Sequence, residues 1–212
     1  VKGYKGKDTH VDLFVGSELA PRFFGWGIPT GPNEGRIGIA TTLPHKPMPF
    51  FRDYFLKGAP SKLLGGAKII NLISGLIPFG VASPSYTDNI ILTGDAAGMA
   101  KPTSGGGIYS GLISADAAFE VASKALNSGN LSSANLSEYQ ALIVNRIGGE
   151  LTKGSYLRKA FLSLNDNQLS EIFQKFDVDG SGTFSMQELE SVVNIFRSEG
   201  GIKDVAAMWT AM

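Results

Sequence analysis

Cysteine is absent from this sequence of 212 residues, and histidine is nearly absent, with only His10 and His45. The lack of cysteine excludes disulfide bonds, thiolate catalysis and cysteine-ligated zinc within the chain. Both histidines lie in the first quarter of the sequence, so a histidine-rich metal site is not expected either.

An excess of charge of either sign is also missing, because 19 lysine and arginine residues balance 19 aspartate and glutamate residues. This balance argues against a nucleic-acid-binding protein, which needs a basic surface. The longest apolar run, about residues 69–82, is interrupted by polar residues, glycine and proline and is too short to span a bilayer. The polar start, VKGYKGKDTH, is not a signal peptide. We expect a cytoplasmic protein, and the sequence leaves a peripheral membrane contact open.

Alternation and turn residues predict strands in the first part of the chain. Polar and apolar residues alternate, and Pro21 and the turn TGPNEG separate the runs, so we expect an antiparallel meander over residues 9–16, 22–29 and 36–42. A short helix is expected over 47–57, a buried strand within 68–82 and a short strand over 89–94. Helical spacing of apolar residues then predicts helices over 107–126, 137–151 and 156–162.

The stretch NIILTGDAAGMAKPTSGGGIYSG, residues 89–111, combines a strand, an acidic turn and a glycine-rich helix start. Asp95 follows the strand, where its carboxylate can accept hydrogen bonds from sugar or ribityl hydroxyls. A bare helix start a few residues later offers N–H groups and positive potential to an electron-rich acceptor. On composition alone, an ordinary strand–turn–helix with a glycine-rich turn explains the stretch equally well.

The segment PRFFGWGIP, residues 21–29, is an aromatic strand within the meander. Alternation places Phe24, Trp26 and Ile28 on one face and Phe23, Gly25 and Gly27 on the other. A half-buried aromatic strand is the more frequent meaning of this pattern. The functional alternative is a wall of an apolar substrate tunnel.

Both segments resemble motifs of known flavoproteins. GDAAG followed by P-x-x-G-G-G-I is similar to the second FAD-contacting motif of the p-hydroxybenzoate-hydroxylase-like flavoproteins. PRFFGWGIP resembles the P-x-x-Y-x-W-x-F-P motif of geranylgeranyl reductases. Trp26 and both prolines match, whereas Phe24 replaces the tyrosine and Ile28 the phenylalanine, which puts any role of the tyrosine hydroxyl in doubt. The resemblance covers about residues 1–165.

The resemblance implies an FAD-dependent enzyme that saturates isoprenoid double bonds of lipids, with a hydride from reduced flavin. It implies that Asp95 contacts the ribityl chain and that Phe24, Trp26 and Ile28 contact the substrate. The backbone of the glycine-rich loop would lie near the pyrimidine edge of the flavin, and the implied cofactor-binding set is Gly94, Asp95, Pro102, Gly105, Gly106, Gly107 and Ile108. The sequence shows no convincing general acid, so it identifies no catalytic residue. It does not identify the electron donor either. The family's first FAD motif is absent, so we expect the sequence to begin inside a domain and to hold FAD poorly alone.

A calcium-binding EF-hand loop is the sharpest motif in the chain, in FDVDGSGTFSMQELE. The loop pattern needs oxygen ligands at positions 1, 3, 5, 7, 9 and 12 and glycine at position 6. Gly182 fills position 6, and the expected Ca²⁺ ligands are Asp177, Asp179, Ser181, the Thr183 carbonyl, Ser185 and Glu188. Apolar residues at helical spacing flank the loop on both sides. The alternative is an acidic surface turn between two helices.

The last residues of the chain, 205–212, repeat the apolar spacing of a helix that enters an EF-hand. Since EF-hands usually pair, we expect the natural protein to continue past Met212 with a second acidic loop. An amphipathic C-terminal helix is the alternative.

These observations predict an α+β fold, the C-terminal part of an FAD-dependent reductase followed by a helical EF-hand region. We expect a substrate-binding sheet over 1–85, a flavin-contacting motif and helix over 86–128, a helical segment over 129–164 and the EF-hand region over 165–212. The first hypothesis is a prenyl reductase with a calcium module. The alternatives are a calcium-binding interaction protein on a non-catalytic flavoprotein-like scaffold, and another flavoprotein of the same fold such as a monooxygenase or halogenase.

Overall fold

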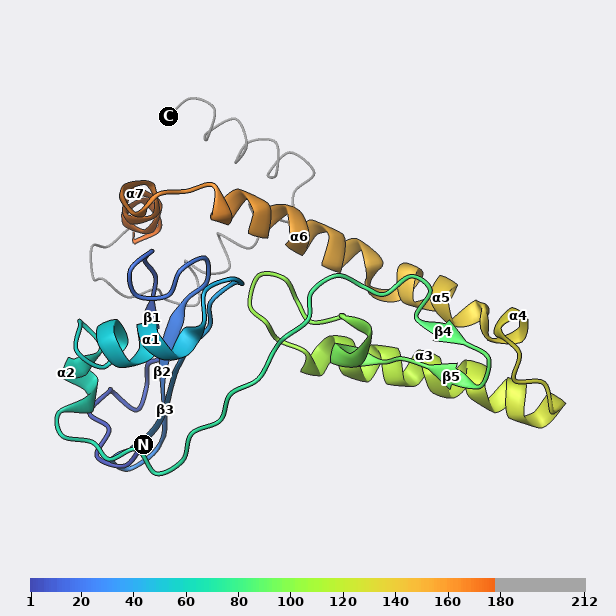
Figure 1. Cartoon of the computed structure of the whole chain (residues 1–212), viewed down its shortest axis with the longest axis horizontal. Helices are drawn as coiled ribbons and strands as arrows, with labels where there is room; N and C mark the ends of the chain where they lie inside the picture. Colours follow the sequence, from blue (N-terminus) through green and yellow to red (C-terminus); the bar gives the residue numbers. More distant parts are fainter. Residues whose placement is uncertain (178–212) are drawn as a thin grey trace. The chain divides into compact units, whose positions relative to one another are not determined.

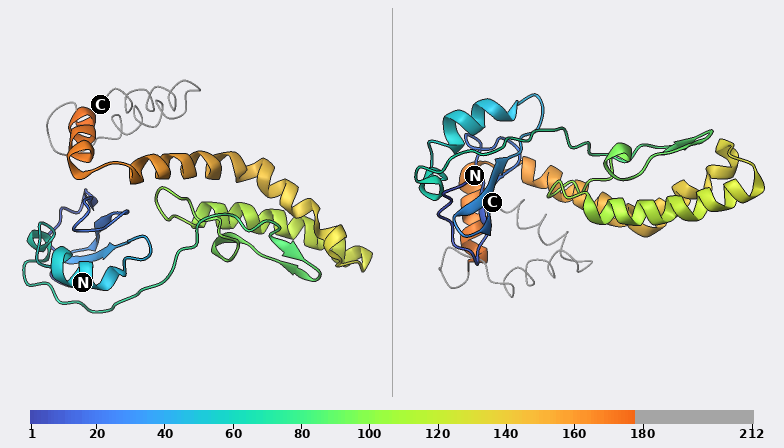
Figure 2. Two further views of the ribbon diagram at one scale, coloured as in Figure 1. Left: turned by 45° about the horizontal axis from the view of Figure 1, so that its top comes forward. Right: turned by 90° about the horizontal axis from the view of Figure 1, so that it is seen from below.

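The computed structural model describes residues 1–177, which belong to two compact units. The first unit consists of residues 1–70 together with the chain from residue 164 onward, and the second of residues 71–163. Figures 1 and 2 show their helices and strands. The fold is mixed α and β, as the sequence predicts. None of the helices within residues 1–177 is both long enough and apolar enough to cross a membrane.

A three-stranded antiparallel sheet lies at the centre of the first unit. Its order is β1 (Asp12–Phe14), β2 (Gly25–Gly31) and β3 (Glu34–Ile39), which confirms the predicted meander. The β2–β3 turn contains Asn33 with a φ of 58°, a left-handed conformation that asparagine adopts more readily than most residues. The turn chemistry read from TGPNEG therefore sets this hairpin.

Gly25 and Gly27 lie on one face of β2 for a steric reason. A Cβ atom at Gly25 would collide with the ring of Phe55, and one at Gly27 with the hydroxyl of Tyr4. Phe55 is fully buried and stacks on Phe51, with ring centroids 5.5 Å apart. The two glycines thus let core aromatic rings approach the strand backbone closely.

Three helical segments and a longer helix complete the first unit. α1 (Pro47–Phe50) runs directly into the π-helix η1 (Phe51–Phe55), in agreement with the helix predicted over 47–57, and α2 (Ser61–Leu64) follows. α7 (Asp166–Phe176) begins at a capping box formed by Asn165 and Gln168, which satisfies two orphan donors of its first turn.

The buried strand predicted within 68–82 is wrong. Residues 69–78 form neither helix nor strand, and Ile73 and Leu76 are 87% and 86% exposed. An apolar run can indicate a buried strand, but a strand also needs a neighbour that accepts its hydrogen bonds. Within residues 1–177 only single bridges pair this region with another segment, at Lys68 and at Phe79.

The second unit is built on the long helix α3 (Ile108–Ser128), close to the prediction of 107–126. A short hairpin, β4 (Tyr86–Thr87) and β5 (Ile90–Ile91), precedes α3, and α4 (Ser133–Leu136) follows it. The chain then forms α5 (Glu138–Ile143), the π-helix η3 (Val144–Gly148) and α6 (Gly149–Leu162) without a break (Figure 1).

The helices predicted over 137–151 and 156–162 are therefore one continuous helical segment, and the expected gap is wrong. Gly154 lies in that gap, and glycine inside a helix costs about 1 kcal/mol relative to alanine. A Cβ atom at Gly154 would lie 3.2 Å from Cδ of Pro102. The glycine thus allows α6 to pack closely on the glycine-rich loop, and this tertiary contact outweighs the helix propensity.

The core of the second unit lies between α3 and the α5–η3–α6 segment. Small residues of α3, including Ala117 and Ala125, pack in one cluster with Tyr139, Ile143 and Ile147. Small side chains on one helix let the larger side chains of the other approach its backbone. The face of α3 that packs in this core consists of Ser110, Ser114, Ala117, Val121 and Ala125.

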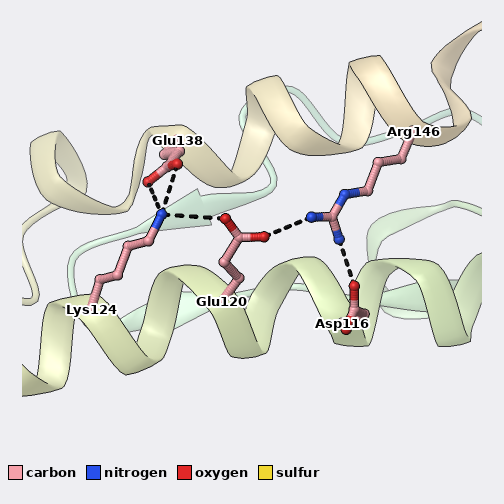
Figure 3. Close-up of polar contacts among 5 residues, drawn as sticks. All are labelled: Asp116, Glu120, Lys124, Glu138 and Arg146. Atoms are coloured by element: carbon pink, nitrogen blue, oxygen red, sulfur yellow. Dashed lines mark hydrogen bonds and ion pairs between the residues drawn. The ribbon is translucent and has the colours of Figure 1, made fainter.

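A chain of ion pairs joins α3 to α5 and η3 along one side of this core (Figure 3). Arg146 donates to Asp116 at 2.7 Å and to Glu120 at 2.6 Å, and Lys124 pairs with Glu120 and Glu138 at 3.3 and 3.0 Å. Hydrogen bonds from Lys124 and Arg146 lower the pKa of Glu120. Exposed pairs contribute little stability individually, but together these occupy the polar side of α3.

Two buried tyrosines make the fold sensitive to alkaline pH. Burial raises the pKa of Tyr139 to about 12, and burial together with Asp12 raises that of Tyr4 to about 12. Between pH 10 and pH 12 the unfolded chain loses phenolic protons that the folded chain retains, so stability falls as pH rises. We expect about 2 kcal/mol of this loss from Tyr139 alone.

Urea unfolding at about pH 8 and about pH 11.5 measures this effect. The urea concentration at the unfolding midpoint should be lower at the higher pH. This decrease should be smaller for Tyr139→Phe than for the parent protein. Equal pH dependence in the parent and the variant would show that Tyr139 does not contribute.

Candidate functional site

The Gly94–Asp95 turn is held in place by α3. The Gly94 N–H donates to Oγ of Ser114 at 2.9 Å, and the Ser114 hydroxyl is itself fully buried. Gly94 has a φ of 52°, a left-handed conformation in which other residues are strained. Gly94 and Asp95 are the first residues of the short 3-10 helix η2 (Gly94–Ala97). The buried hydrogen bond from Gly94 to Ser114 therefore fixes the backbone position of Asp95.

The carboxylate of Asp95 lies against the start of α3. A Cβ atom at Gly107, the residue that precedes the helix, would collide with Oδ1 of Asp95. Asp95 is exposed, and no side chain caps the start of α3. The unpaired N–H groups of a first helical turn carry partial positive charge. The sequence prediction that a carboxylate and a bare helix start come together is therefore confirmed.

The loop between η2 and α3 is tied down at Lys101. The Lys101 N–H donates to the Gly106 carbonyl at 2.9 Å, and the Gly105 N–H to the Lys101 carbonyl at 2.8 Å. The Lys101 ammonium pairs with Glu150 of α6 at 2.7 Å and lies 4.7 Å from the ring centroid of Tyr109. The loop is thus fixed at its base, and the Gly106 N–H donates to the Ser104 hydroxyl at 3.3 Å.

The predicted cofactor-binding residues all belong to this turn, loop and helix start. Pro102 is buried beneath the loop, whereas Gly106 and Ile108 are exposed. Sequence reasoning missed Lys101 and Ser114, which hold the loop and the turn. The sequence could have indicated Ser114, because Ser110 and Ser114 are one helical turn apart among the small residues of the buried face of α3.

A cavity of about 490 Å³ lies in the second unit, beside the base of the loop. Its walls come from the segments around residues 80–83 and 98–102 and from α5, η3 and α6, and include Val81, Ala100, Pro102, Ile143, Leu151 and Thr152. Its size is in the range of small-molecule sites. The sequence patterns did not indicate it, since its lining is mostly small and apolar.

The aromatic strand segment lies in the first unit. Phe24, Trp26 and Ile28 are half-buried on the face of β2 opposite the buried glycines. The rings of Phe24 and Trp26 meet edge-on with centroids 6.1 Å apart, and the Trp26 ring covers Gly38. The face is a half-buried aromatic surface, and its role as a substrate wall stays a prediction.

The calcium loop lies almost entirely outside the described residues. Asp177, its first position, directly follows α7, whereas Asp179, Ser181, Thr183, Ser185 and Glu188 belong to residues 178–212. Among residues 1–177 no group of three or more His, Asp or Glu side chains could hold a metal ion. The predicted Ca²⁺ ligands stay a prediction.

Comparison with known proteins points to one group of relatives, although no protein-family model matches the sequence. The chain is 34% identical over 169 residues to digeranylgeranylglycerophospholipid reductase 2 of Methanosphaera stadtmanae, covering 78% of this chain and 42% of the relative. It is 30% identical over 165 residues to the protein of the same name from Methanococcoides burtonii, covering 76% and 39%. An uncharacterized protein of Methanocaldococcus jannaschii is 30% identical over 200 residues, covering 87% and 50%. The chain thus spans half or less of the length of these relatives.

A solved structure shows the fold. The crystal structure of a geranylgeranyl bacteriochlorophyll reductase-like protein from Thermoplasma acidophilum matches with a TM-score of 0.75 and 22% sequence identity. The match covers 97% of this chain and 52% of that chain. The chain therefore has the architecture of about half of that larger protein.

Proposed function

We propose that this chain forms the flavin- and substrate-contacting half of an FAD-dependent reductase that saturates isoprenoid double bonds of membrane lipids. The observation that carries the proposal is the Asp95 carboxylate against the uncapped start of α3. Similarity to proteins named digeranylgeranylglycerophospholipid reductase supports the substrate class. The similar fold of the Thermoplasma protein supports the reductase architecture proposed for this chain.

The residues present fit a flavin. The exposed Asp95 carboxylate is a strong acceptor for ribityl hydroxyls, and the N–H groups that begin α3 suit the electron-rich pyrimidine edge. Glycine at 105–107 places no side chain of its own between the backbone and a planar ring. Bound flavin would supply the hydride. The chain's own part is to bind and orient the ring system and to favour negative charge near the start of α3.

Two other functions remain as alternatives. A monooxygenase or halogenase would need the same flavin contacts, but the similarity to named lipid reductases and the Trp26 motif favour reduction. A non-catalytic scaffold that only binds calcium would need none of the flavin contacts. Flavin content and reductase activity therefore separate the three.

Reductase activity of the complete gene product tests the proposal. Incubation with a geranylgeranyl-chain phospholipid and a chemical reductant should add one H2 per double bond, read by mass spectrometry. Trp26→Ala should raise KM roughly 10- to 100-fold, because loss of an aromatic contact with the substrate costs about 1.5–3 kcal/mol. Tyr54→Ala is the control, since Tyr54 is a half-exposed aromatic residue of the same unit. Equal KM values for both variants would remove Trp26 from the substrate site.

We also propose that the chain binds calcium at the loop that begins with Asp177. The supporting observation is the position of α7, which ends at Phe176 immediately before the first ligand. The start of α7 is fixed to the β1–β2 connection, where the Ser17 N–H and hydroxyl donate to Asp166 at 3.0 and 2.9 Å. Helix α7 thus has the place of the entering helix of an EF-hand.

Calorimetric titration with Ca²⁺ tests this site. One ion should bind per chain, and Glu188→Gln should weaken binding at least about tenfold, because the bidentate ligand at position 12 loses its charge. Glu190→Gln removes a nearby carboxylate that the loop pattern does not use and should leave the affinity unchanged. The calcium proposal fails if Glu188→Gln and Glu190→Gln bind equally well.

A further inference from the structure

One face of helix α6 lies against the base of the glycine-rich loop between η2 and α3. Glu150, Gly154 and Arg158 follow one another at intervals of four residues, the spacing that puts side chains on one helical face. Each of the three lies against Lys101 or Pro102, the residues at the base of the loop. We call these five residues the loop clamp.

The polar contacts of the loop clamp hold the loop at two points. The Glu150 carboxylate accepts the Lys101 ammonium at 2.7 Å, and the Arg158 guanidinium donates to the carbonyl of the buried Pro102 at 3.1 Å. The same guanidinium lies 4.9 Å from the ring centroid of Phe79. Hydrogen bonds with an ionised donor or acceptor are stronger than neutral ones, so α6 fixes the backbone at the base of the loop.

Lys101 also reaches the first turn of α3. Its ammonium lies 4.7 Å from the ring centroid of Tyr109, the second residue of that helix, and a cation is attracted to the face of an aromatic ring. Its backbone N–H and carbonyl bond to Gly106 and Gly105. One residue therefore joins α6, the glycine-rich loop and the helix start.

We propose that the loop clamp positions the flavin site, with Lys101, Glu150 and Arg158 as positioning residues that act through the loop backbone. The inference rests on the proposed flavin site. The clamp holds the loop and the unpaired N–H groups of α3 in one arrangement, and such preorganised dipoles need no rearrangement when negative charge develops. Loosening the clamp should therefore weaken the binding of reduced, anionic flavin more than that of oxidised flavin.

Lys101→Met in the complete gene product tests the clamp, because methionine keeps an unbranched side chain but loses the ammonium. Affinity for FAD, from titration of the deflavinated protein, should fall roughly five- to tenfold, since the ion pair and the cation–π contact are lost together. Lys101→Arg should retain most of the affinity, because arginine also pairs with carboxylates and lies over aromatic rings.

Lys124→Met is the matched control. It breaks ion pairs of the same unit, between α3 and α5 (Figure 3), about four turns along α3 from the helix start. Affinity for FAD should be unchanged in this variant. The double variant Lys101→Met/Glu150→Gln should bind FAD no more weakly than Lys101→Met alone, because both changes remove the same contact.

The reduction potential of the bound flavin separates positioning from a merely structural role. If Lys101→Met weakens the binding of reduced flavin tenfold more than that of oxidised flavin, the midpoint potential falls by about 30 mV. Reduction of the loaded protein beside a reference dye measures this shift. Lys101→Arg should restore the parent potential.

Gly154→Ala is an independent test that removes no polar group. Alanine favours the helix, but its methyl group would lie 3.2 Å from Cδ of Pro102 and push α6 from the loop. Affinity for FAD should therefore fall, by less than in Lys101→Met. Gly149→Ala is the control in the same helix, since a Cβ atom there meets nothing within 4 Å.

Two outcomes would overturn the inference. One is equal FAD affinity and equal potential in Lys101→Met and Lys124→Met. The other is a loss of affinity in Lys101→Met that arginine does not restore and that leaves the potential unchanged, since it would make the clamp a structural support only. A parent protein that takes up no flavin would contradict the proposed function and this inference with it, so the two failures are distinguishable.

Discussion

Asp95→Ala is expected to lower the affinity of the complete gene product for flavin by roughly 10- to 100-fold. Hydrogen bonds to a charged group contribute about 1.5–3 kcal/mol, and the Asp95 carboxylate is exposed beside the start of α3, ready to accept them. Titration of the deflavinated protein with FAD, followed by flavin fluorescence, measures the change. Asp95→Asn should lose less, since the amide keeps one acceptor oxygen.

Gly107→Ala provides an independent test of the same geometry. A methyl group at this position would collide with Oδ1 of Asp95 and displace the carboxylate from the helix start, so flavin affinity should fall although every polar group is retained. Gly111→Ala is the matched control, because one turn further along α3 a Cβ atom meets nothing within 4 Å. Asp116→Asn removes a different exposed carboxylate of α3. If Asp95→Ala binds FAD as tightly as Asp116→Asn, Asp95 is not a cofactor residue.

Tyr139→Ala is expected to be the most destabilising single change in the second unit, costing about 3–5 kcal/mol as for other buried aromatic residues. Tyr139 is fully buried in the core cluster, and its hydroxyl donates to the Leu92 carbonyl at 2.7 Å. A loss of this size should lower the melting temperature by roughly 10 °C. Differential scanning calorimetry measures it.

Tyr139→Phe separates packing from hydrogen bonding. The ring is kept but the Leu92 carbonyl loses its donor, so a cost of about 1–3 kcal/mol is expected. Tyr156→Ala, at a tyrosine of α6 that is 60% exposed, should change stability by under about 0.5 kcal/mol. Equal melting temperatures for Tyr139→Ala and Tyr156→Ala would contradict this account of the core.

The sequence was enough to predict the elements that are determined by residues close together in the chain. The β2–β3 hairpin follows from its turn residues, and α3 follows from apolar spacing over five turns. The Gly94–Asp95 turn could be predicted as a candidate site because a carboxylate, glycines and a helix start occur close together in the sequence. The structure adds the contact between Asp95 and Gly107 that makes them one site.

Features that depend on distant neighbours could not be predicted. The run at 69–78 is apolar enough for a buried strand, but no partner strand exists for it within residues 1–177. The continuous helix through Gly154 depends on its contact with Pro102, 52 positions away in the sequence. Nothing in the sequence around Lys101 indicates that it holds the loop, because this role depends on its contacts with Glu150 and Tyr109.

The absorption spectrum of the purified complete gene product tests the central claim most directly. If Asp95 and the first turn of α3 hold an isoalloxazine, the protein should carry one flavin per chain, visible as a band in the blue that bleaches on reduction. A colourless protein that gains no such band after incubation with excess FAD would contradict the account.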